Sequence, residues 1–263
     1  MINLKANMQT ELASLPFIQA DFRLTQFNGG TVNSSYRLDS GKNSYFVKTF
    51  ESDEVNLLDR ERLFNIQHDL AAKGLSVLPV YLSQKNHFQI DQWLDQPTLD
   101  SANLAGSEIT KRLASILAHI HSLDVVAAPL DLPSEWEHYL EITQADSQNL
   151  STDKVRSMAK IWRDACSERA TFCHNDLALA HVTDSQPPVV FDWEYCAISC
   201  PYFDLASCIK VNGLDATDQA SLCAYYAQYT ELHLSEVVNK VKTMQPLVDF
   251  TYHLWYHSAS IVS

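Results

Sequence analysis

Short apolar runs separated by turn-forming residues dominate the first hundred residues, a pattern typical of a small β-sheet. The turn-forming residues 39–42 separate two of these runs and predict a β-hairpin. Further along, Leu63, Ile66 and Leu70 recur at helical spacing and stop before Gly74, which predicts one helix. The strand-like runs are residues 22–27, 35–38, 45–50, 77–82 and 87–94.

From residue 101 onward, apolar residues recur at intervals of three and four, which predicts helices. One apolar stripe covers residues 109–123 and another covers residues 237–255. Pro246 lies inside the second stripe, where we expect a kink or the start of a new helix. The other expected elements are helices over residues 135–149 and 153–169 and a strand–loop–strand unit over residues 171–193.

This change of pattern predicts an α+β chain in two parts. Residues 1–94 would form a small lobe with an antiparallel sheet and one helix, and residues 95–263 would form a larger, mainly helical lobe. A crevice between two such lobes is a common place for a ligand.

Composition narrows the class of protein. The chain has 263 residues, 46% hydrophobic and 19% charged, which is typical of a folded protein with a sizeable core. It carries 32 Asp and Glu against 19 Lys and Arg, a net charge of −13, which argues against nucleic-acid binding because phosphates recruit basic surfaces. The acidic excess is compatible with a cationic ligand, although solubility is the simpler interpretation.

The sequence also bears on location. It contains no run of about 18 apolar residues, so we expect no membrane span. The first fifteen residues lack the apolar core of a secretory signal. The six cysteines include no CxxC pair, which favours reduced thiols in a cytoplasmic protein over disulfides or a zinc site.

Two acidic residues, Asp176 and Asp192, each follow an apolar run. Strand ends are well placed to present catalytic groups, and residues 186–188 (QPP) between the two acids predict a turn that brings them together. Taken singly, each acid is more simply explained as a turn former or a helix cap.

Together these residues resemble the catalytic and metal-binding loops of the aminoglycoside phosphotransferase/choline kinase family. The pattern is dense over residues 172–206, and it is similar to bacterial choline-kinase-like and thiamine-kinase-like enzymes. The resemblance implies a protein kinase-like bilobal fold and transfer of the γ-phosphate of ATP, with Mg²⁺, to the hydroxyl of a small metabolite. The matching residues are His174, Asp176, a polar residue five positions later, Asp192-Trp193-Glu194-Tyr195, Pro201 and Asp204-Leu205-Ala206.

In this resemblance Asp176 would orient the acceptor hydroxyl and accept its proton, and Asp192 would hold Mg²⁺ at the nucleotide phosphates. His181 stands where the family normally has asparagine, and imidazole suits Zn²⁺, Cu²⁺ or Ni²⁺ better than Mg²⁺. Three outcomes follow: His181 binds the metal weakly or through water, one Mg²⁺ suffices, or catalysis is degraded.

Shorter matches to the family lie in the first hundred residues. Gly29, Gly30 and Asn33 belong to a segment that resembles the loop covering the nucleotide, although a glycine pair between strands is also an ordinary turn. Trp93 falls where the family has the connector between lobes, whose backbone would meet adenine.

A lysine inside an apolar strand is a further match. Lys48 would bind the α- and β-phosphates, and Glu61 of the following helix would hold it in place. Considered alone, Glu61 is more simply a solvated helix residue. His121, at the end of an apolar stripe, is expected to have a core or supporting role.

The choline-kinase-like sequence after Asp192 implies an acceptor with a cationic nitrogen, such as choline, ethanolamine or thiamine. Such a site needs aromatic faces and a nearby carboxylate. We expect Glu194 and Asp204 as the acids, although Asp204 also fits as a helix cap. The aromatic candidates are Tyr195, Tyr202, Tyr252, Trp255 and Tyr256. Of these, we expect Tyr195 and Trp255 to bind the acceptor.

Other functions stay open at this point. An aminoglycoside acceptor would call for a wide, strongly acidic pocket. A pseudokinase that binds nucleotide or a small ligand without turnover is the competing hypothesis, motivated by His181. The sequence indicates neither the oligomeric state nor the choice between ATP and GTP.

Overall fold

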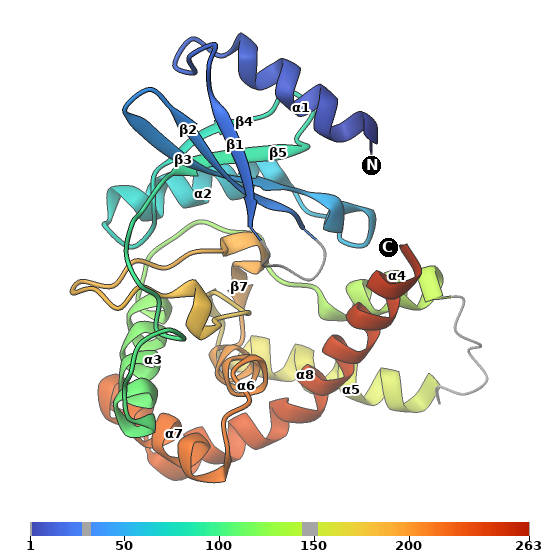
Figure 1. The fold of residues 1–263 in the computed structure, drawn as a ribbon. Coiled ribbons are helices and arrows are strands. Elements are labelled where there is room, and N and C mark those ends of the chain that lie inside the picture. The colour runs from blue at the N-terminus through green and yellow to red at the C-terminus, as the bar shows by residue number, and fades with distance from the viewer. Residues whose placement is uncertain (1, 28–32, 144–151, 263) are drawn as a thin grey trace. The chain divides into compact units, whose positions relative to one another are not determined.

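The computed structural model of the chain describes residues 2–27, 33–143 and 152–262 (Figure 1). The chain divides into two compact units, an N-terminal unit that ends at Asp95 and a C-terminal unit over residues Gln96–Val262. Each unit has its own arrangement of helices and strands, and each is described by itself.

A five-stranded antiparallel sheet forms the centre of the N-terminal unit, with the strand order β1-β2-β3-β5-β4. Each strand lies within a run that the sequence pattern predicts or differs from it by two residues at most, and Gly41, with φ of 60°, lies in the turn between β2 and β3. The expected antiparallel sheet is therefore confirmed. Its strands are β1 (Arg23–Phe27), β2 (Ser35–Ser40), β3 (Asn43–Thr49), β4 (Pro79–Leu82) and β5 (Phe88–Gln92).

One helix of this unit, α1 (Ile2–Ser14), is not foreseen in the sequence analysis. Its buried residues Met8 and Leu12 lie one helical turn apart and pack in one cluster with Leu38 and Val47 of the sheet. In the sequence Leu4, Met8, Leu12 and Leu15 recur at intervals of three and four, a helical spacing that the sequence analysis did not interpret as a helix.

A second helix, α2 (Arg60–Ala72), follows the short 3₁₀ helix η1 (Glu51–Glu54) and lies on the other side of the sheet from α1 (Figure 1). The Asp59 carboxylate caps it by accepting a hydrogen bond from the backbone N–H of Arg62 at 3.0 Å. Gly74, with φ of 76°, follows its end, as the sequence predicts.

Helices make up most of the C-terminal unit, as its apolar stripes predict. Helix α3 packs against α7, and α8 packs against α4 and α6 (Figure 1). Helix α8 continues through Pro246, so no new helix starts there. The helices are α3 (Gly106–His121), α4 (Leu132–Thr143), α5 (Thr152–Glu168), α6 (Pro201–Val211), α7 (Ala216–Thr230) and α8 (Leu234–Val262).

Two short strands of the C-terminal unit, β6 (Thr171–Cys173) and β7 (Ala197–Ser199), pair in antiparallel fashion. The sequence pattern places the second strand earlier, directly before Asp192, and that prediction is wrong. Val190 there forms only an isolated bridge with Val182. The two prolines before this segment lack backbone N–H groups, so the segment cannot extend a hydrogen-bonded ladder in that direction.

Among the helices in the described part of the chain, none is both long enough and apolar enough to cross a lipid bilayer.

The packing of α1 predicts the effect of truncating one of its side chains. Leu12 is fully buried, so Leu12→Ala should lower the free energy of unfolding by about 2–5 kcal/mol, measured by urea denaturation. Leu57, which is 82% exposed, provides the matched control, and Leu57→Ala should cost less than about 0.5 kcal/mol. Equal losses for the two variants would contradict the docking of α1 on the sheet.

Candidate active site

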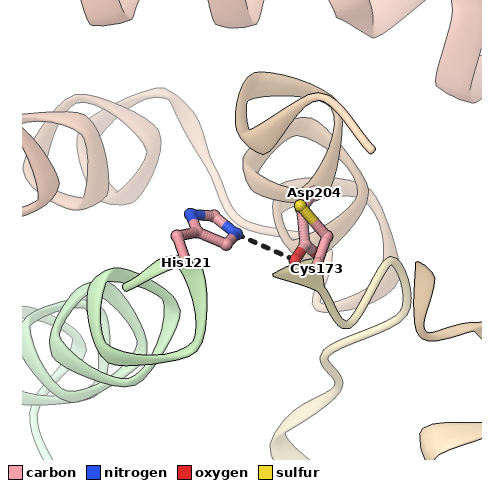
Figure 2. Close-up of side chains that lie close together, drawn as sticks. All are labelled: His121, Cys173 and Asp204. Atoms are coloured by element: carbon pink, nitrogen blue, oxygen red, sulfur yellow. Dashed lines mark hydrogen bonds and ion pairs between the residues drawn. The ribbon is translucent and has the colours of Figure 1, made fainter. Parts of the chain in front are cut away.

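The loop after β6 is held by one buried carboxylate of α6. The backbone N–H groups of His174 and Asn175 donate to the Asp204 Oδ2 and Oδ1 atoms, each at 2.8 Å. Asp204 is completely buried, and its Oδ2 atom also lies 3.0 Å from His121 Nε2 (Figure 2). The other nitrogen of His121 is 2.8 Å from the hydroxyl of Tyr226. Helices α3, α6 and α7 therefore all contribute to fixing this loop.

These contacts favour a different role for Asp204 from the acceptor-binding role that the sequence analysis expects. Its carboxylate is engaged by three donors and has no exposed edge, so the geometry favours a role in holding the loop rather than in binding an acceptor. Asp204 does not cap α6 either, because the capping position is Cys200.

His121, Cys173 and Asp204 form a buried cluster whose potential metal ligands lie within 4.8 Å of one another (Figure 2). Each of these atoms already has a protein partner, since Cys173 Sγ lies 3.5 Å from the Ser199 carbonyl oxygen. Burial raises the pKa of the Cys173 thiol well above its usual value, so the thiolate that binds metals is disfavoured. The cluster is best explained as the anchor of the loop.

His174 connects the two loops that carry the predicted acids. Its Nε2–H donates to the Phe191 carbonyl oxygen at 2.9 Å, so its Nδ1 accepts from the backbone N–H of Asp176 at 3.3 Å. Burial, with a smaller contribution from His181, lowers the pKa of His174, and the ring is therefore neutral. This neutral ring links the backbone of Asp176 to the residue that precedes Asp192.

Asp176 lies half-buried after this anchor, and a tyrosine of α8 contacts it. The Tyr252 hydroxyl donates to Asp176 Oδ1 at 2.6 Å. The same hydroxyl lies 3.2 Å from Ser207 Oγ, and Ser207 donates to the Asn175 carbonyl oxygen at 2.6 Å. Burial and the negative charge of Asp176 raise the pKa of the Tyr252 phenol, so it stays protonated and remains a donor.

His181 lies between the two acids. Its Nδ1 is 3.0 Å from the backbone carbonyl oxygen of Asp176, and its Nε2 is 3.5 Å from Asp192 Oδ2. The side chains of His181 and Asp192 are 21% and 30% exposed, so both are accessible to an ion. Phe191 N–H donates to the His181 carbonyl oxygen at 2.7 Å, which holds the short 3₁₀ helix η2 (Leu179–His181) beside the Asp192 loop.

Two residues of these loops, one directly before Asp176 and the other Asp192 itself, have an unusual backbone conformation. Asn175 and Asp192 have φ of 66° and 57°, in the left-handed region that few non-glycine residues occupy. Asn175 compensates with its side chain, whose Nδ2 donates to the Tyr195 carbonyl oxygen at 2.9 Å and whose Oδ1 accepts from the Ser199 hydroxyl at 2.7 Å. These bonds fix the direction in which the chain leaves the loop at Asn175.

Besides Asp204, the predicted acceptor residues lie in two segments of the C-terminal unit. Glu194 and Tyr195 are in the 3₁₀ helix η3 (Trp193–Tyr195), directly after Asp192. Burial, and then the charges of Glu194, Asp176 and Asp192 among others, raise the pKa of the Tyr195 phenol, so it stays protonated. Trp255 is on α8, three residues after Tyr252, and its ring meets the Tyr256 ring edge-on at 5.1 Å.

In the N-terminal unit, Lys48 lies on the face of the sheet opposite α1 and pairs in register with Gln89. Gln89 Nε2 donates to Asp91 Oδ1 at 2.7 Å, and Gln67 Nε2 of α2 donates to the same oxygen at 3.1 Å. Glu61, the expected partner of Lys48, is exposed in the first turn of α2. The buried Asp91 carboxylate, on the same sheet face as Lys48, is an acid that the sequence analysis missed.

The remaining predicted residues of the N-terminal unit have separate surroundings. Gly29 and Gly30 lie outside the described residues. Asn33 accepts a hydrogen bond from the backbone N–H of Ser52 at 2.8 Å. The Trp93 ring stacks on Phe27 at 5.6 Å, and the Arg37 guanidinium lies 4.7 Å from the ring centre.

Tyr252 contacts Asp176 in a way that the sequence analysis did not foresee, whereas the buried His121 fits the expected core or supporting role although its partner could not be named. Tyr252 is only one of several aromatic candidates in the sequence, and nothing local distinguishes it from Tyr256. Its contact with Asp176 joins residues 76 positions apart, and the contact of His121 with Asp204 joins residues 83 positions apart. No sequence periodicity reports such pairs.

The anchor leads to a stability prediction. Asp204→Ala leaves two buried backbone N–H groups and His121 without an acceptor, so it should lower the free energy of unfolding by about 3–5 kcal/mol. Asp249 bonds Lys210 at 2.7 Å on the surface, so Asp249→Ala should cost less than about 1 kcal/mol. Urea denaturation of both variants is the measurement. A loss for Asp204→Ala as small as that of the control would refute the anchor.

The chain is similar in sequence to known phosphotransferases. Residues 23–237 match the pattern of the phosphotransferase enzyme family. Choline kinase B1 of Caenorhabditis elegans is 23% identical over 155 residues, which are 49% of this chain and 42% of that protein. The match thus spans less than half of that relative.

Solved kinase structures share the fold. Choline kinase LicA from Streptococcus pneumoniae matches with a TM-score of 0.76 and 19% identity, over 98% of this chain and 91% of that chain. LicA in complex with AMP gives a TM-score of 0.74 and 17% identity, over 97% and 90%. Plasmodium vivax ethanolamine kinase gives 0.75 and 14% identity, over 95% and 79%.

At these identities the structural likeness establishes the fold, and it confirms the expected kinase-like α+β class. The sequence match covers well over half of the chain and includes the loops that carry Asp176, His181 and Asp192. The chain belongs to the phosphotransferase enzyme family.

Proposed function

We propose that this protein transfers the γ-phosphoryl group of ATP to the hydroxyl of a small metabolite that bears a cationic nitrogen. The observation that carries the proposal is the arrangement around His181, whose two ring nitrogens lie 3.0 Å from the Asp176 backbone and 3.5 Å from the Asp192 carboxylate. Phosphoryl transfer depends mainly on positioning and on neutralising charge, and this arrangement supplies one acid for each task.

Asp176 would orient the acceptor hydroxyl and accept its proton. The Tyr252 hydroxyl engages only Oδ1 of the carboxylate, so the bond fixes the direction of the carboxylate and leaves Oδ2 for the acceptor. The bond from Tyr252 also limits rotation of the Asp176 side chain. Asp176 can then receive a proton without first reorganising.

Asp192 and His181 would hold a divalent metal. Asp192 offers a carboxylate oxygen, the ligand that Mg²⁺ prefers, and its side chain is partly exposed, so the residues present fit a metal ion. When bound, the ion would neutralise the negative charge of the nucleotide phosphates. The part of this chain is to fix the two side chains, through the left-handed backbone of Asp192 and the bond between Phe191 and His181.

The N-terminal unit would bind the nucleotide, with Lys48 on the phosphates and the segment that contains Gly29, Gly30 and Asn33 around them. Glu61 keeps its proposed role as the partner of Lys48, with the buried Asp91 as a second acid on the same sheet face. Trp93, stacked on Phe27, would lie near the base.

The acceptor would be an amino-alcohol such as choline, ethanolamine or thiamine. Tyr195 directly follows Glu194 in η3, and an aromatic ring with a carboxylate close by suits a cationic nitrogen. Trp255, one turn from Tyr252 on α8, would offer a second aromatic face. Two of the similar proteins are named as choline kinases and one as an ethanolamine kinase, which favours this class of acceptor.

Substitution of Asp176 tests the reaction. Asp176→Asn should lower kcat by about 10²–10⁴-fold, because amide nitrogen and oxygen cannot accept the hydroxyl proton. The assay detects phosphorylated product after incubation with ATP, a divalent metal and one of choline, ethanolamine, thiamine or an aminoglycoside. Asp249→Asn, on the surface of α8, is the matched control and should retain full activity. Tight nucleotide binding without product from any acceptor would reject turnover and indicate a pseudokinase.

Removal of the Tyr252 hydroxyl tests the orientation of Asp176. Tyr252→Phe should lower kcat about 10- to 100-fold, since a hydrogen bond to a charged group contributes about 1.5–3 kcal/mol, while the KM for ATP stays unchanged. Tyr256→Phe is the control, because Tyr256 is on the same helix and its side chain is 51% exposed. Steady-state kinetics of both variants decide the outcome: equal kcat values would show that Tyr252 does not orient Asp176.

A further inference from the structure

The His181 ring has a defined tautomer in its neutral form. Its Nδ1 lies 3.0 Å from the backbone carbonyl oxygen of Asp176, and a carbonyl oxygen can only accept a hydrogen bond. Nδ1 therefore carries the proton. A neutral imidazole has one N–H, so Nε2 presents a lone pair.

This lone pair faces a carboxylate. Nε2 lies 3.5 Å from Asp192 Oδ2, and the two side chains are 21% and 30% exposed. A metal ion from solvent can therefore reach a nitrogen and an oxygen ligand at once. Two ligands at right angles, each about 2.1 Å from one metal ion, lie about 3 Å apart, close to the separation observed.

The two ligands are held by the backbone rather than by flexible side chains alone. Phe191 N–H donates to the His181 carbonyl oxygen at 2.7 Å, and the His174 ring bonds the Phe191 carbonyl oxygen at 2.9 Å. Asp192 itself has a left-handed backbone with φ of 57°. A rigid nitrogen–oxygen pair favours ions that accept both ligand types.

Mg²⁺ demands oxygen ligands, whereas imidazole nitrogen suits the first-row transition ions. We propose that His181 and Asp192 form a metal site that prefers Mn²⁺, Co²⁺ or Zn²⁺ over Mg²⁺. The proposal rests on the proposed function for the presence of a metal–nucleotide complex, and it changes the identity of the metal. It does not require turnover, because binding involves only these two side chains and the nucleotide.

The test measures metal binding by the full-length protein with ADP present and no acceptor. Titration of free Mn²⁺ by electron paramagnetic resonance, with Mg²⁺ as competitor, gives the ratio of the two affinities. We expect His181→Asn to lower the Mn²⁺/Mg²⁺ ratio at least tenfold, because the amide oxygen replaces the imidazole nitrogen. His119→Asn, at an exposed histidine of α3, should leave the ratio unchanged.

A spectroscopic signature reports the ligand directly. Pulsed electron paramagnetic resonance of bound Mn²⁺ should show coupling to an imidazole ¹⁴N nucleus in the wild type and in His119→Asn. The coupling should be lost in His181→Asn. Wild-type protein without this coupling, or with the same Mn²⁺/Mg²⁺ ratio as His181→Asn, would overturn the proposal and make His181 a protonated partner of Asp192.

The two proposals fail in distinguishable ways. Nitrogen coupling without phosphorylation of any acceptor supports the metal site and rejects turnover. Phosphorylation with Mg²⁺ and no nitrogen coupling supports the enzyme and rejects the metal preference.

Discussion

The buried carboxylate of Asp204 is the group on which the arrangement of the candidate site depends. Two consecutive backbone amides, from His174 and Asn175, need an acceptor inside the protein, and a carboxylate without water needs donors. The two amides and the carboxylate can satisfy one another only when the loop approaches α6 in one conformation. The direction of Asp176, the next residue, follows from that conformation.

From this anchor, hydrogen bonds spread through the site. His174 reaches Phe191, Asn175 reaches Tyr195 and Ser199, and Tyr252 reaches Asp176 itself. Such a network is most favourable when all its members are satisfied, and it determines geometry more strictly than apolar packing alone. It explains how a small region can hold several side chains in defined positions.

Local sequence patterns predict much of the fold. Features that depend on contacts between residues far apart in the sequence are harder to predict. The stripe of α3 and the hairpin of β2 and β3 are recognisable because their signals lie within a few residues. Helix α1 is missed although Leu4, Met8 and Leu12 recur at helical spacing, because polar residues separate them and the stripe is short. Strand β7 is misplaced because its pairing with β6 spans more than twenty residues.

In the site, His181 stands out in the sequence as a departure from a family pattern. The position of Asp204, in contrast, depends on backbone amides about thirty residues earlier in the chain.

The left-handed backbone at Asn175 and Asp192 limits which amino acids can occupy these positions. Asparagine and aspartate are the side chains that accept this conformation most easily, while a typical residue costs about 1–2 kcal/mol there. At Asp192 the backbone and the chemistry thus demand the same residue type, and few substitutions satisfy both. His181, in a short 3₁₀ helix, has no such restriction. The backbone therefore restricts the residue type less at position 181 than at position 192, so the side chain that lies between the two acids is the one that can vary most freely.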